Sequence, residues 1–169
     1  MAFIEPYKIA VPQTQLEILK KKLELATFPD ELDEAEWDYG SPLADIKRLT
    51  ARWRDGYDWR AAEAKLNDFP QFTTDISIVG YETFKVHFIH QKSVVKKAIP
   101  LIFVHGWPGS FDEVTKILPE LVRGGKEKPA FHIVAPSLVN FGFSQGTKKV
   151  CIDRWFEDTV ADSSFAHST

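Results

Sequence analysis

Two largely apolar runs in the second half of the chain, the first of them continuous, restrict its fold more than any other feature. They cover Ile99–Val104 and Phe131–Ala135. Runs without alternating polar residues are typical of strands that are buried on both faces of a parallel sheet. Between them, a capping box at Ser110–Glu113 opens a helical pattern over residues 110–123, and Gly124-Gly125 ends it. The order strand, helix, strand predicts a parallel βαβ unit.

The connection from the first run to this helix is the best candidate for a functional site. It reads His105-Gly106-Trp107-Pro108-Gly109 and follows a predicted parallel strand, at the sheet end where open α/β folds bind ligands. The glycines allow the backbone to approach a ligand closely, and a Trp-Pro bond is able to adopt the cis form. The Trp107 N–H is then a candidate donor for developing negative charge, as in an oxyanion hole. A purely structural strand-to-helix turn is an equally open alternative.

The front of the chain contains three amphipathic helical patterns. Their start signals are a capping box at Thr14–Glu17, an N-cap and first-turn proline at Ser41-Pro42, and an Asp58 cap. Their stop signals are Phe28-Pro29, Gly56 and Pro70. The apolar stripes comprise Leu16, Leu19 and Leu23, then Leu43, Ile46, Leu49 and Trp53, then Trp59, Ala62, Leu66 and Phe69. We interpret the stripes as core packing, with a ligand cradle as the alternative.

After the helices, the hydrophobic period changes to two. Apolar and polar residues alternate over residues 72–78 and 84–88, on either side of Gly80, which predicts an antiparallel hairpin. His87 and His90 are three residues apart on a strand and therefore point to opposite faces. They are interpreted as ordinary strand histidines rather than as a pair of metal ligands.

The composition excludes several classes of protein. The 169 residues carry a net charge of −3, which argues against a nucleic-acid partner. The single cysteine, Cys151, allows neither a disulfide framework nor a thiolate metal site, and favours a cytoplasmic location. No run approaches the roughly 18 apolar residues that span a membrane, and the N-terminus lacks the pattern of a signal peptide.

Three segments together resemble the microsomal-type epoxide hydrolases of the α/β-hydrolase superfamily. They are HGWPGS (105–110), YDWRAAEAKLNDFPQF (57–72) and PSLVNFGFSQG (136–146). The resemblance implies an α/β fold in which a helical meander and a strand hairpin lead into a partial α/β-hydrolase sheet. It divides the chain into an N-terminal domain with the first hairpin strands (1–98), the start of the catalytic core (99–149) and an atypical tail (150–169).

The resemblance also implies a mechanism and a substrate class. In this family, an Asp on a nucleophile elbow attacks a hydrophobic epoxide and forms a covalent ester, while two Tyr hydroxyls activate the ring oxygen. A His oriented by an acidic residue directs water at the ester, and a vicinal diol is released. The family motif matches His105, Gly106, Trp107 and Pro108, with the oxyanion donor at the Trp107 N–H. The mechanism uses no metal and no cofactor, and detoxification is the implied role.

The turn is the only part of that catalytic set which we match in this sequence. The resemblance stops near Lys149, and the elbow Asp, the cap tyrosines and the acid–base pair have no counterpart here. We therefore expect a truncated or altered reading frame after Lys149, and no turnover by the chain alone. The alternative function is that of a non-catalytic fragment, an interaction module that self-associates through an open sheet edge.

A second catalytic pattern is present but lacks the right context. Gly142-Phe-Ser144-Gln-Gly146 matches the G-x-S-x-G nucleophile elbow, and Asp158 or Asp162 and then His167 follow in the hydrolase order. An elbow Ser leaves a buried strand and enters a helix, whereas Ser144 is flanked by loop residues. We therefore reject Ser144 as a nucleophile.

Overall fold

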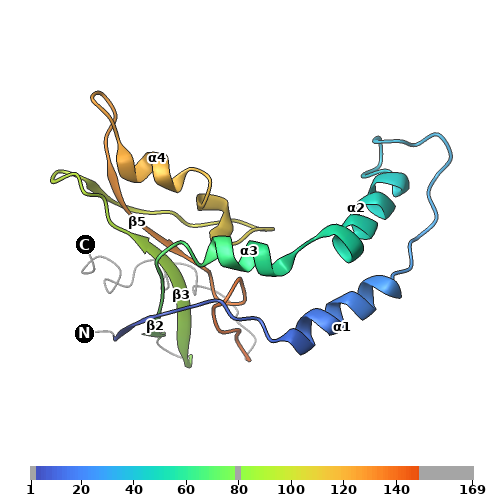
Figure 1. Cartoon of the computed structure of the whole chain (residues 1–169), viewed down its shortest axis with the longest axis horizontal. Coiled ribbons are helices and arrows are strands. Elements are labelled where there is room, and N and C mark those ends of the chain that lie inside the picture. Colours follow the sequence, from blue (N-terminus) through green and yellow to red (C-terminus); the bar gives the residue numbers. More distant parts are fainter. Residues whose placement is uncertain (1–2, 79–80, 149–169) are drawn as a thin grey trace. The chain divides into compact units, whose positions relative to one another are not determined.

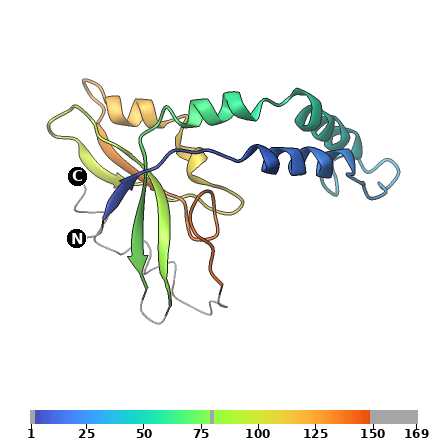
Figure 2. The same ribbon diagram turned by 60° about the horizontal axis from the view of Figure 1, so that its bottom comes forward.

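The computed structural model describes residues 3–78 and 81–148 and contains two compact units (Figures 1 and 2). One unit comprises Ile9–Leu66 and holds the helices of the front part. The other combines residues 3–8 with residues 67–78 and 81–148 and holds the sheet. The hairpin strands thus belong to the same compact unit as the βαβ segment.

The second unit is built on a mixed five-stranded sheet with the order β1-β2-β3-β5-β4. The strands are β1 (Ile4–Pro6), β2 (Gln71–Ser77), β3 (Thr83–Gln91), β4 (Ile99–Ile102) and β5 (Phe131–Pro136). Neighbouring strands are antiparallel except for β4 and β5, which are parallel. The α/β fold class and the parallel βαβ unit are therefore confirmed.

The predicted hairpin is also confirmed. Strands β2 and β3 pair in the register Phe72 to Phe88 and Ile76 to Phe84. Because side chains alternate along a strand, one face of this hairpin collects the large apolar residues. Together with Val134 of β5 and Val139 after it, they form a buried cluster that comprises Ile76, Ile78, Phe84, Val86, Phe88, Val134 and Val139. The predicted turn at Gly80 lies outside the described residues.

The opposite face of β3 is buried as well, around His87. Its imidazole is fully buried, with Nε2 2.9 Å from Gln71 Oε1 and Nδ1 2.9 Å from Ser137 Oγ. Aromatic rings of Tyr7 and Phe111 lie edge-on against it, at centroid distances of 5.1 and 4.8 Å. Burial lowers the pKa of His87 to about 4, because an apolar surrounding disfavours the charged ring.

His90 confirms the predicted separation of the two histidines. Its ring lies against Phe72, on the face that carries the apolar cluster, whereas His87 lies on the other face. Burial is also the first cause of a lowered pKa at His90, followed by repulsion from Lys92 and His132.

The prediction of one continuous helix over residues 110–123 is wrong. The structure has a 3₁₀ turn, η1 (Phe111–Val114), followed by the short helix α4 (Leu118–Arg123). Pro119 explains the break, because it has no N–H to donate and is tolerated only in the first turn of a helix. The predicted stop is confirmed: Gly124 adopts φ 60° and its N–H bonds to the carbonyl of Glu120.

The prediction that the first apolar run is buried on both faces is wrong. β4 ends at Ile102 instead of Val104, and the side chains of Ile99 and Ile102 are 49% and 38% exposed. The reason is its position at the sheet edge, where β5 is its one neighbour among the described strands. β5, which lies between two strands, carries the burial expected of such a run, with Ile133, Val134 and Ala135 buried.

The first unit contains α1 (Gln13–Glu24), α2 (Leu43–Gly56) and α3 (Trp59–Leu66), with α1 and α2 side by side (Figure 1). The prediction of a capping box at Thr14 is wrong. Pro12 is the N-cap of α1, and its carbonyl accepts the Gln15 N–H. Helix α1 ends at Glu24 and α3 at Leu66, in each case before the predicted stop.

The cap of α2 involves a residue distant in the sequence, whereas the cap of α3 is local. Pro42, not Ser41, is the N-cap of α2, and the Leu43 N–H donates to the carboxylate of Glu31 over 2.7 Å. That partner is twelve residues away, outside the range of local capping patterns. The cap of α3 is confirmed, since the Ala61 N–H donates to Asp58 Oδ1 over 3.0 Å.

We expect acid to destabilise the sheet unit through His87. The folded pKa of about 4 is below the unfolded value of 6.5, so between these pH values the unfolded chain binds a proton that the folded chain does not. The free energy of unfolding should therefore fall as the pH drops from 6.5 to 4, by up to about 3 kcal/mol from this group. Urea denaturation across this range measures the slope.

His87→Gln is the control, since it removes the titrating group and retains a polar side chain. Its pH slope between 6.5 and 4 should be shallower than that of the parent. Parallel curves for the two proteins, or an ordinary pKa for His87 by NMR titration, would contradict the expectation.

Candidate functional site

The turn predicted as a site lies at the carboxyl end of β4. The backbone continues the pairing for one step beyond the strand, since the Phe103 N–H donates to the carbonyl of Val134 over 2.9 Å. The chain then turns through residues 105–109 and enters η1, where Ser110 Oγ accepts the Asp112 N–H. The Trp107–Pro108 peptide bond is cis, and the side chain of Trp107 is 85% exposed.

His105 anchors this turn to the segment that follows β5. Its side chain is buried, and Nε2 accepts the backbone N–H of Leu138 over 3.1 Å. Because Nε2 accepts, the ring proton resides on Nδ1, which donates to the Gly106 carbonyl over 3.0 Å. The ring also lies edge-on against Phe141, at a centroid distance of 5.0 Å. Both nitrogens are thus used within the chain, and His105 acts as a positioning residue for the turn.

The two glycines of the turn differ in the space available to a side chain. A Cβ at Gly109 would lie 2.9 Å from the carbonyl oxygen of Gly106 and would overlap the Glu113 side chain. Gly106 has open space on its Cβ side, with nothing within 4 Å. Gly109 therefore permits close packing within the turn, whereas the space beside Gly106 is free for a ligand.

The structure supports the rejection of Ser144 as a nucleophile. Ser144 lies in a turn, and its Oγ accepts the His87 N–H over 2.9 Å and donates to the Ser137 carbonyl over 2.6 Å. Gly142 has φ 52°, and a Cβ there would lie 2.6 Å from Ser137 Oγ. The G-x-S-x-G match is therefore a packing motif around Ser137. The predicted partners Asp158, Asp162 and His167 lie outside the described residues.

The sequence pattern did not predict the buried polar cluster around His87. A period-two pattern assigns His87 to the polar face of its strand, and that face is covered by residues far away in the sequence. The one sequence signal was the aromatic content of the PSLVNFGFSQG segment, since Phe143 is a third ring against His87.

The helical stripes line hollows in the first unit. Neither α1 nor α2 contains a buried residue, so the core-packing interpretation is wrong for these two helices. Two helices side by side leave their remaining faces uncovered within this unit. One hollow, of about 440 Å³, is lined by Leu19, Leu49, Arg52, Trp53, Tyr57 and Trp59.

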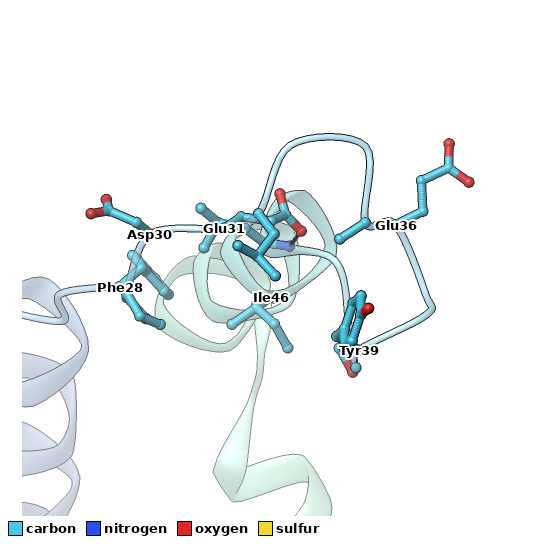
Figure 3. Close-up of a pocket in the computed structure, with 12 residues that line it drawn as sticks. Phe28, Asp30, Glu31, Glu36, Tyr39 and Ile46 are labelled. Atoms are coloured by element: carbon cyan, nitrogen blue, oxygen red, sulfur yellow. Dashed lines mark hydrogen bonds between the residues drawn. The ribbon is translucent and has the colours of Figure 1, made fainter.

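A second hollow, of about 300 Å³, lies between the loop after α1 and the start of α2 (Figure 3). Its apolar lining includes Phe28 and Ile46, and Glu31 lies at the N-terminus of α2, where it caps Leu43. Glu36 points away from the hollow (Figure 3). No ligand chemistry follows from this arrangement, because its central carboxylate is used for capping.

Neither a metal centre nor a membrane span is found in the part of the chain that the structure describes. Over residues 3–78 and 81–148, no group of three or more His, Cys, Asp or Glu side chains is placed to hold a metal ion. Over the same residues, no helix is both long and apolar enough to cross a bilayer.

Comparisons with known proteins identify relatives of this chain. The family profile described as "Epoxide hydrolase N terminus" matches residues 4–114. A putative epoxide hydrolase of Stigmatella aurantiaca is 43% identical over 145 residues, covering 83% of this chain and 32% of that protein. Juvenile hormone epoxide hydrolase 2 of Ctenocephalides felis is 38% identical, covering 86% of this chain and 31% of that protein.

Solved structures give the same result. An enantioselective mutant of epoxide hydrolase from Aspergillus niger superimposes with a TM-score of 0.77 at 31% identity, over 97% of this chain and 42% of that one. The fold is thus the front part of an α/β-hydrolase. More narrowly, the chain belongs to the epoxide hydrolase family, and it spans about a third of the length of the curated relatives described above.

We expect the turn to tolerate alanine at Gly106 but not at Gly109. Gly109→Ala should lower the free energy of unfolding by about 1–3 kcal/mol, because the new methyl group meets a backbone carbonyl that cannot move freely. Gly106→Ala is the matched control and should change it by less than about 0.5 kcal/mol. Urea denaturation monitored by far-UV circular dichroism measures both. Equal effects of the two substitutions would contradict this description of the turn.

Proposed function

We propose that this chain supplies the oxyanion-binding turn of an epoxide hydrolase that converts hydrophobic epoxides to vicinal diols through a covalent Asp ester. The Trp107 N–H is the proposed donor to the ester oxyanion, with His105, Gly106 and Pro108 holding it in place. The observation that carries the proposal is the His105 bridge between the Gly106 carbonyl and the Leu138 amide. This bridge pre-organises the turn, which is what electrostatic stabilisation of a transition state requires.

Two further observations support the proposal. The space beside Gly106 is open, so a substrate oxygen can approach the backbone there. The 85% exposed Trp107 side chain contributes little to packing, which is consistent with a residue that acts through its main chain. The cytoplasmic location and the role in detoxification remain predictions.

The proposed donor is a backbone group, so the test must remove an N–H while leaving the fold intact. We suggest a chimera in which residues 1–148 replace the matching front part of the Stigmatella aurantiaca relative. Trp107→Pro removes the N–H and should lower kcat for styrene oxide about 10²–10³-fold. Trp107→Ala keeps the N–H and should retain most of the activity. Diol formation, measured by chromatography, gives both values.

The 169-residue chain alone is the second arm of this experiment. Because we match no nucleophile in it, we expect no diol above a heat-denatured control. Turnover by the chain alone would contradict the expectation that this chain supplies the oxyanion donor but no nucleophile. Equal activity of the two Trp107 variants would contradict the assignment of the oxyanion donor.

Self-association through the open sheet edge is the weaker alternative. The N–H groups of Ile99 and Phe103 bond toward β5, so those of residues 100 and 102 face the open side. Residue 100 is a proline and has no N–H, which leaves Ile102 as the one donor that β4 presents there. Prolines on edge strands limit pairing with other chains, so this edge is poorly suited to strand addition.

If the alternative holds, the chain forms a dimer that depends on the Ile102 N–H. Sedimentation equilibrium should then show a dimer for the parent and a monomer for Ile102→Pro. A monomeric mass for the parent at every concentration would contradict the alternative.

A further inference from the structure

Two loops meet at the end of the sheet opposite the HGWP turn. They are residues 92–98, between β3 and β4, and residues 124–130, between α4 and β5. Because β4 and β5 are parallel, the loops that precede them lie at the same end, as both views show (Figures 1 and 2). A hydrogen bond of 2.9 Å from the Ile99 N–H to the Ala130 carbonyl joins the two segments. We call this pair of loops the basic rim.

The basic rim concentrates positive charge in a chain whose net charge is −3. Its exposed lysines are Lys92, Lys96, Lys97, Lys126 and Lys128. Glu127 is the one acidic residue in the two loops, and Asp68, which precedes β2, is the next along the same end of the sheet. No ion pair with these lysines is found among the described residues. Their charges are therefore available to an anionic partner.

Two exposed valines, Val94 and Val95, lie among these lysines in the loop of residues 92–98 and form an apolar tip. The side chain of Val94 is 98% exposed and that of Val95 is 40% exposed. The buried Ser93 holds this part of the loop, since its Oγ donates to the Val122 carbonyl over 2.6 Å and accepts the Val95 N–H over 3.1 Å. The Ser93 N–H also donates to His132 Nδ1 over 3.0 Å. Val94 is thus presented to solvent by a loop that is hydrogen-bonded in place.

We propose that the basic rim binds the surface of an anionic membrane. The lysines would contact lipid headgroups, and Val94 would insert at the interface, where burial of its side chain is favourable. An exposed aliphatic tip surrounded by lysines matches the two layers of such a surface, an apolar boundary beneath negative headgroups. Neither loop contains an aromatic residue on which a nucleic-acid base could stack, so a lipid surface fits better than a single-stranded nucleic acid.

The position of the basic rim has a consequence for the site. The HGWP turn follows the carboxyl end of β4, whereas the rim precedes the amino end of the same strand. A membrane bound at the rim would therefore leave the turn accessible. The proposal does not depend on catalysis, and binding alone tests it.

The experiment measures binding of the purified chain to vesicles by flotation. We expect binding to phosphatidylcholine vesicles that contain about one third phosphatidylserine, and none to vesicles of phosphatidylcholine alone. Lys96→Gln with Lys97→Gln should weaken binding roughly 30-fold, since each lysine near an anionic surface contributes about a factor of five. Val94→Asp should weaken it roughly 10-fold or more through loss of apolar insertion.

The matched control is Lys21→Gln with Lys22→Gln, which removes the same charge from exposed positions on α1. It should leave vesicle binding unchanged, and circular dichroism should show the same fold for every variant. Absence of binding to the anionic vesicles, or equal loss in the α1 control, would overturn the proposal. Complete competition by inorganic phosphate would also overturn it, because a free anion would then account for the affinity.

Discussion

The pairing of β5 with strands on both of its sides is the constraint on which the sheet unit depends. β5 is antiparallel to β3 on one side and parallel to β4 on the other. It therefore joins a local hairpin, made of neighbouring segments, to a βαβ unit whose strands are far apart in the sequence. Its central residues are buried because both edges and both faces are covered. β4, which has one partner among the strands that the structure describes, is partly exposed although its sequence is also largely apolar.

The segment that leaves β5 organises the two polar centres of the unit. Leu138 donates its N–H to His105, and this contact holds the HGWP turn at the end of β4. One residue earlier, the Ser137 hydroxyl meets His87, and its backbone carbonyl accepts from Ser144. A buried imidazole needs partners for its nitrogens, because an unpaired polar group in an apolar interior is costly. The same short segment therefore positions the turn and completes the buried face of β3.

Sequence reasoning succeeded where local chemistry decides the outcome. The hairpin follows from its period of two, the Asp58 cap from its position before Trp59, and the end of α4 from Gly124. It failed where distant residues or a single proline decide. Glu31 caps α2 from outside the helix, and Pro119 divides the helix expected after Ser110. The fold class and the position of the turn were thus predictable, whereas the caps and the degree of burial were not.

The sequence by itself determined the order of elements, the family and the turn that merits attention, because these depend on hydrophobic periodicity and on a short motif. Only the tertiary structure decided which apolar strand is central and which lies at the edge, because that depends on how many neighbours a strand acquires. It also decided that His105 is a positioning residue and that Ser144 is a packing residue. Each of these side chains is defined by its hydrogen-bond partners, and those partners lie up to 57 residues away in the chain.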